Sequence, residues 1–103
     1  MNQEFLNQLE QWNEEDQYQE IIDAIEALPE EALDFTLTSA LARAYNNLAM
    51  DLMPPEDRPL YQRALDLLLP LEDRLEEAVK QDPDVAHTWH FRVAYAYFYL
   101  DQE

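Results

Sequence analysis

The stretch that decides the fold is Ser39–Leu48, SALARAYNNL, because its order of small and aromatic side chains returns in Arg92–Leu100, RVAYAYFYL. A shorter version stands near the start of the chain, where Trp12 and Tyr18 are six residues apart. Recurrence at a spacing of about 20 to 50 residues is typical of stacked helix pairs, because one pair cannot bury its apolar face alone. The sequence therefore predicts a helical array, and such arrays are more often binding surfaces than catalysts.

Composition indicates the same class of fold. The 103 residues include no glycine, which removes phosphate-cradling loops and the common tight hairpin turns. The chain is rich in Leu, Ala, Glu and Gln, which are good helix formers. We therefore expect one all-α domain over residues 1–103, with five to six helices.

Two further absences bear on the compartment. The chain has no cysteine, which excludes disulfides, thiolate zinc sites and a cysteine nucleophile and fits a reducing environment. The first residues, MNQEFLNQLEQW, carry no basic cluster, and no stretch approaches the roughly eighteen apolar residues that span a bilayer. We expect a cytoplasmic protein.

The charge is extreme and unevenly distributed. The formal net charge is −17 at pH 7, and residues 1–34 hold eleven acidic side chains and no Lys or Arg. The other 69 residues hold twelve acids and six bases. Such a surface repels phosphate backbones and anionic lipids, so we expect neither direct nucleic-acid binding nor membrane association. The acidity attracts basic partners, and it also keeps a helical array soluble.

Apolar side chains recur at spacings of three and four, which predicts five helical segments. The expected helices cover residues 3–13, 16–28, 34–50, 57–81 and 82–100. Pro70 removes an amide and crowds the preceding turn, so we expect a kink or a break within the fourth helix. The expected aspartate caps are Asp16 with Gln19, Asp34, and either Asp82 or Asp84.

This order of residues resembles the tetratricopeptide repeat, a helix pair with a period of about 34 residues. The matching positions are Leu9, Trp12, Tyr18, Ile21 and Ile25 in the first unit, Leu41, Ala42, Tyr45, Tyr61, Ala64 and Leu68 in the second, and Trp89, Val93, Ala94 and Tyr97 in the third. The resemblance covers nearly the whole chain, as units of about residues 1–33, 34–81 with inserts, and a half unit at 82–103.

The spacing of the aromatic residues agrees with this period. Trp12 to Tyr45 is 33 residues, and Tyr45 to Tyr97 is 52, which is one period plus ten residues in the proline loop and eight after Pro70. The resemblance implies antiparallel helix hairpins stacked as a short right-handed superhelix. An ordinary five-helix bundle is the alternative.

In similar proteins the first helices of successive pairs line a concave groove that receives an extended peptide or a partner helix. Carried over to this chain, the expected groove consists of Leu6, Glu10, Asn13, Ser39, Arg43, Asn46, Asn47, Phe91, Tyr95, Phe98 and Tyr99. Asn46 and Asn47 can donate to and accept from a peptide backbone, although amides are also ordinary near a helix C-terminus. Some members hold a C-terminal carboxylate with several basic side chains, and only Arg43 and Arg92 are available here. We therefore expect a basic or amphipathic partner.

The third unit would be incomplete, because Glu103 stands where its second helix would begin. Val93, Ala94, Tyr97 and Leu100 would then lack a covering helix, so we expect this self-association patch to form a homodimer through the C-terminal helix. Two alternatives are a longer array, of which this chain is the N-terminal piece, and a kinked helix around Pro70 that folds back over the patch.

Candidate catalytic residues are few. His87 and His90 are three residues apart, but no further ligand at a partner spacing completes a zinc site. Adjacent acids such as Glu14 and Glu15 diverge on a helix, so they cannot act on one bond as acid and base. We expect no enzyme activity, no cofactor and no metal.

The function that the resemblance implies is a protein–protein interaction module that binds a peptide or protein in its groove. The alternative is an acidic decoy or immunity-type protein that masks a basic surface of a toxin or nuclease. Salt distinguishes them, because binding driven by charge weakens steeply with ionic strength and groove packing does not.

Overall fold

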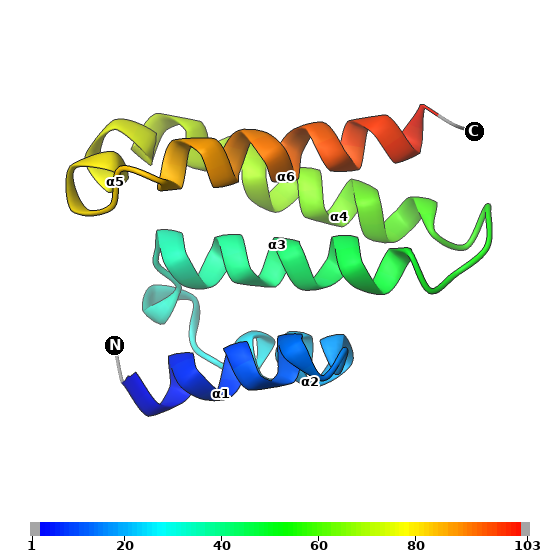
Figure 1. Cartoon of the computed structure of the whole chain (residues 1–103), viewed down its shortest axis with the longest axis horizontal. Coiled ribbons are helices and arrows are strands. Elements are labelled where there is room, and N and C mark those ends of the chain that lie inside the picture. Colours follow the sequence, from blue (N-terminus) through cyan, green and yellow to red (C-terminus); the bar gives the residue numbers. More distant parts are fainter. Residues whose placement is uncertain (1–2, 102–103) are drawn as a thin grey trace.

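The computed structural model describes residues 3–101, and every regular element in that range is helical (Figure 1). The α-helices are α1 (Gln3–Glu14), α2 (Tyr18–Glu26), α3 (Phe35–Ala49), α4 (Arg58–Leu68), α5 (Leu75–Gln81) and α6 (Val85–Leu100). The two short 3₁₀ segments are η1 (Glu30–Ala32) and η2 (Leu69–Arg74). The expected all-α fold of five to six helices is confirmed.

Successive helices form antiparallel hairpins. Figure 1 shows α1, α3 and α6 one above another and running in the same direction, with α4 running back between α3 and α6. The main packing contacts join α2 to α1 and α3, and α4 to α3 and α6. Side-chain hydrogen bonds also join α1 to α3 and α3 to α6. The first helices of the hairpins therefore lie side by side.

The core is divided between the two ends of this stack. One cluster joins α1, α2 and α3, and its fully buried side chains include Ile21, Ile25 and Leu37. Two further clusters join α3, α4 and α6 through Ala64, Leu68 and Trp89, and through Tyr61, Leu65 and Ala96. α3 contributes to both ends, which explains why its buried residues lie on two sides of the helix.

Trp89 connects α6 to the end of α4. Its indole Nε1 donates a hydrogen bond to the carbonyl oxygen of Leu68 at 2.8 Å, and its side chain is only 4% exposed. Leu68 is the last residue of α4, where carbonyl groups lose their helical partners. The bond therefore fixes the start of α6 against the point where α4 stops.

The three aromatic residues of the repeat pattern differ in their surroundings. Trp12 and Tyr45 are half-buried against the cluster of α1, α2 and α3. Tyr97 is 46% exposed, because no helix within residues 3–101 covers its side of α6. The spacing predicts similar surroundings for all three aromatic residues, and this holds for Trp12 and Tyr45 but not for Tyr97.

The capping expectation is confirmed at Asp34. Its carboxylate accepts a hydrogen bond from the amide of Leu37 at 2.8 Å, as expected for a residue that caps a helix N-terminus. Asp84 is the residue that precedes α6, but its side chain makes no capping bond. Asp82 instead accepts from the Asp84 amide at 3.1 Å, which orders the turn before the helix.

The capping expectation is wrong at Asp16. This residue has a φ of 61°, and Gln17 takes the N-cap position of α2. The Gln17 amide donates to the Trp12 carbonyl at 2.8 Å and the Asp16 amide to the Asn13 carbonyl at 3.3 Å, which is the bonding pattern of a Schellman motif. Asp16 therefore ends α1 in the left-handed position that glycine usually takes, and Gln19 bonds to Asp23 instead of forming a capping box.

Pro70 breaks the fourth expected helix. α4 ends at Leu68, η2 follows with Pro70 in its first turn, and α5 begins only at Leu75. The ring removes one amide and crowds the preceding carbonyl, so the chain takes up the tighter 3₁₀ geometry there. None of the helices within residues 3–101 combines the length and the apolar character needed to cross a bilayer.

Candidate binding cleft

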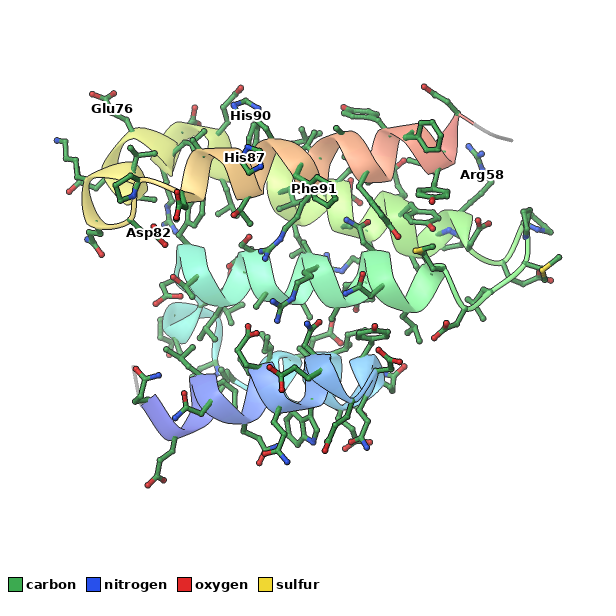
Figure 2. The ribbon with its side chains drawn as sticks, in the orientation of Figure 1. Arg58, Glu76, Asp82, His87, His90 and Phe91 are labelled. Carbon is green, nitrogen blue, oxygen red and sulfur yellow. The ribbon has the colours of Figure 1, made fainter. Side chains whose placement is uncertain are left out.

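A cleft of about 370 Å³ lies between α3 and α6. Its lining residues are Arg43, Asn46, Asn47, His87, Thr88, Phe91, Arg92 and Tyr95. They recur at intervals of three and four on each helix, so each set forms one stripe that faces the other helix. Figure 2 shows His87 and Phe91 along the first half of α6.

The structure brings five of the expected groove residues together in this cleft. They are Arg43, Asn46, Asn47, Phe91 and Tyr95. His87, Thr88 and Arg92 also line it. From the sequence, Arg92 is named only as an available cation, and His87 and Thr88 are not placed in the groove. Helical spacing could have found His87, which lies one turn before Phe91, whereas Arg92 required knowledge of which side of α6 meets α3.

The expected residues on α1 lie beside the cleft and do not line it. Glu10 forms an ion pair with Arg43 at 3.0 Å, and Asn13 accepts a bond from Asn47 at 3.4 Å. Leu6 packs partly buried against the core cluster of α1, α2 and α3. α1 therefore extends the polar face of the cleft and supplies the carboxylate that pairs with Arg43.

The other three expected residues have different environments. Ser39 is 5% exposed, and its hydroxyl and carbonyl oxygens accept hydrogen bonds from Arg92. Tyr99 stacks on Tyr61 with ring centroids 5.4 Å apart, and Phe98 is exposed and does not line the cleft. Ser39 thus joins α3 to α6, and Tyr99 supports the α4–α6 packing. Phe98 faces outward, because α6 turns its last aromatic residues away from α3.

Two guanidinium groups lie at the floor of the cleft. One Arg43 nitrogen pairs with Glu10, but its Nε and Nη2 atoms are buried without a hydrogen-bond partner. Arg92 is largely buried, and this burial, reinforced by the charge of Arg43, lowers its pKa to about 10. Arg92 still carries a positive charge at neutral pH.

Asn46 adds an acceptor to this floor. Its amide nitrogen donates to the Arg92 carbonyl at 3.2 Å, while its Oδ1 atom is buried without a partner. Buried polar groups in folded proteins almost always have a hydrogen-bond partner, so unpaired groups of this kind suggest a ligand, an ion or water. Two residues that line the cleft therefore hold unpaired guanidinium donors and an unpaired acceptor, all of them buried beneath the cleft surface.

The rim of the cleft is aromatic. The rings of Phe91 and Tyr95 have centroids 6.0 Å apart, and Phe91 is 62% exposed. Tyr95 is held at the rim by a hydrogen bond from its hydroxyl to the Met50 sulfur, and burial raises its pKa. The cleft thus combines apolar contact area at the opening with charge at the base.

The histidine pair does not converge on one point. His87 lines the cleft, whereas the His90 ring lies edge-on against Trp89 with centroids 4.9 Å apart. The described residues contain no group of three or more His, Asp or Glu side chains that could hold a metal ion. His87 is therefore placed to contact whatever occupies the cleft.

No protein-family model, curated protein or solved structure matches this chain. The resemblance to the tetratricopeptide repeat accordingly depends on the sequence pattern.

Proposed function

We propose that this chain is a tetratricopeptide-like interaction module, without catalytic activity, that binds a peptide or protein segment in the cleft between α3 and α6. The observation that carries the proposal is the set of unpaired donors and acceptors at the cleft floor. A partner carboxylate that displaced the side chains covering the Arg43 nitrogens would satisfy these nitrogens in a low-dielectric site, where charge-assisted hydrogen bonds are strong. The cysteine-free composition supports a cytoplasmic location.

The partner we propose is amphipathic, and basic outside the segment that enters the cleft. The net charge of −17 attracts cationic side chains to the surface around the cleft, and Glu10 lies beside the opening. One acidic group would contact the guanidinium floor, and an apolar side chain would contact Phe91 and Tyr95. A partner that is basic but lacks the acidic group and the apolar side chain would not make these contacts.

The test is a selection of random peptides displayed on phage against the whole chain, followed by calorimetry with an enriched peptide. We expect enriched sequences to share an acidic group, and Arg43→Gln to weaken binding roughly 10- to 100-fold, since hydrogen bonds to charged groups contribute about 1.5–3 kcal/mol. Arg63→Gln is the matched control, because Arg63 lies on α4 outside the cleft and pairs with Glu26 at 3.8 Å. Equal losses in the two variants, or no enrichment, would overturn the proposal.

A specific observation also favours the decoy alternative. All eleven acidic side chains of residues 1–34 are exposed, so the N-terminal hairpin presents a strongly negative surface. If this surface were the binding site, charge reversal of Glu14, Glu15 and Asp16 would abolish capture of a basic protein such as a nuclease, and raised salt would do the same. Insensitivity to both changes would exclude the decoy.

A further inference from the structure

One side of α6 is largely apolar and stays exposed, although α4 and α5 pack against other sides of the helix. The exposed positions are 87, 90, 91, 94, 97, 98 and 101, which form one stripe along the helix that we call the outer stripe. Phe91, Tyr97 and Phe98 are 62%, 46% and 58% exposed. Exposed aromatic side chains that lie along one stripe usually mark an interaction site, so a covering element is to be expected.

The outer stripe differs from the patch expected from the sequence. Ala94 and Tyr97 belong to it, but Val93 and Leu100 pack partly buried against the clusters shared with α4. α5 contacts α6 and yet leaves the stripe exposed, so the folded-back helix expected as an alternative does not cover it. The outer stripe contains Phe91 and Phe98, which the expected patch did not include, and it lacks Val93 and Leu100.

Charge narrows the choice of what can cover the stripe. Residues 85–100 contain no acidic side chain, although the whole chain has 23, and Asp101 is the single acid of the outer stripe. α3 is likewise free of acids, but α2 and α4 cover it. The outer stripe is therefore the place where two copies, each with a net charge of −17, can touch with the least repulsion.

The spacing of the stripe is symmetrical about Ala94. Three positions on each side lie three, four and seven residues away, so two antiparallel copies related by a twofold axis at Ala94 meet position for position. Phe91 would then face Tyr97 of the second copy, and His87 would face the second copy's Asp101. The small alanine at the axis allows the two helices to approach closely.

We propose that two copies of this chain pair through the outer stripe, with their α6 helices antiparallel and Ala94 on the twofold axis. Three aromatic side chains of about 200 Å², each near half exposure, bury roughly 300 Å² per copy. With the histidines and Ala94 the interface totals about 1,000 Å², the low end for specific association, so the dimer forms at micromolar concentrations. This inference does not rest on the proposed function, because it requires no ligand.

The first test is sedimentation velocity on the whole chain from about 5 to 500 µM. The wild type should move from 12.2 kDa towards twice that mass as concentration rises. Ala94→Glu places two like charges at the axis and should weaken the dimer at least tenfold, while Gln62→Glu adds the same charge at an exposed site on α4 and should not. A monomer throughout the range, or equal association of the two variants, overturns the proposal.

The second test uses the absence of cysteine. Ala94→Cys supplies the only thiol, and a twofold axis at that residue brings two copies within disulfide distance. Mild oxidation should crosslink this variant, and Gln62→Cys should stay monomeric. Crosslinking of both variants to the same extent would show collisional chemistry only and would contradict the proposed pairing.

Discussion

Replacing Trp89 with phenylalanine removes the connection between α6 and the end of α4. The hydrogen bond to the Leu68 carbonyl is buried, and losing it costs about 1–3 kcal/mol if the carbonyl stays dry. The smaller ring leaves a cavity beside Ala42, Ala64 and Leu71, which adds about 1 kcal/mol. We therefore expect the free energy of unfolding to fall by about 2–4 kcal/mol, a large share of the 5–15 kcal/mol of an average domain.

The assay is urea denaturation monitored by far-UV circular dichroism. Tryptophan fluorescence is unsuitable because Trp12 also contributes to that signal. With a slope of about 1–2 kcal/mol per molar urea, the midpoint should fall by roughly 1–4 M. Trp12→Phe is the matched control, since Trp12 is only half-buried, and it should lower the free energy of unfolding by less than about 1 kcal/mol. Equal losses at the two positions would refute the reasoning.

Three further predictions concern stability and use the same denaturation assay. Asp34→Ala removes the cap of α3 and should lose about 1 kcal/mol, whereas Asp84→Ala should change little because its side chain makes no capping bond; equal effects would contradict the cap assignment. Asp16→Val forces a β-branched residue to a φ of 61° and should lose about 1–2 kcal/mol, while Asp16→Gly should lose less; the reverse order would contradict the Schellman motif. Burial, followed by the hydrogen bond to Glu26, raises the pKa of Tyr45 above its usual value of 10. The contribution of Tyr45 to the free energy of unfolding is therefore fully present below pH 10 and is lost as the pH rises through the raised pKa. Between pH 8 and 11 the free energy of unfolding should fall less in Tyr45→Phe than in the wild type, and parallel curves would contradict this.

The fold was predictable because its signals are local. Spacings of three and four place each helix, and Asp34 stands directly before an apolar stripe, where its carboxylate meets free amides. Pro70 similarly acts on its own turn. Asp16 was misassigned because two local roles compete there, and the absence of glycine requires another residue to take the left-handed position at the end of α1.

The candidate cleft was predictable only in part. Helical spacing placed Asn46 and Phe91 on facing helices, but the rotation of α6 about its axis depends on packing. Trp89 sets that rotation through its bond to Leu68, a contact between residues 21 positions apart that no local pattern shows. The same rotation brings Arg92 into the cleft and turns Phe98 to the outside.

His87 and Phe91 belong both to the rim of the cleft and to the outer stripe of α6. A partner that covers either ring would compete with the second copy of the chain for the same atoms. Partner binding in the cleft and dimerisation through α6 are therefore coupled, and each must weaken the other by the same factor. The affinity of the cleft for its partner would then be higher in a dilute solution of the protein than in a concentrated one. The concentration of the protein in the cell would thereby determine the fraction of monomer that can bind a partner.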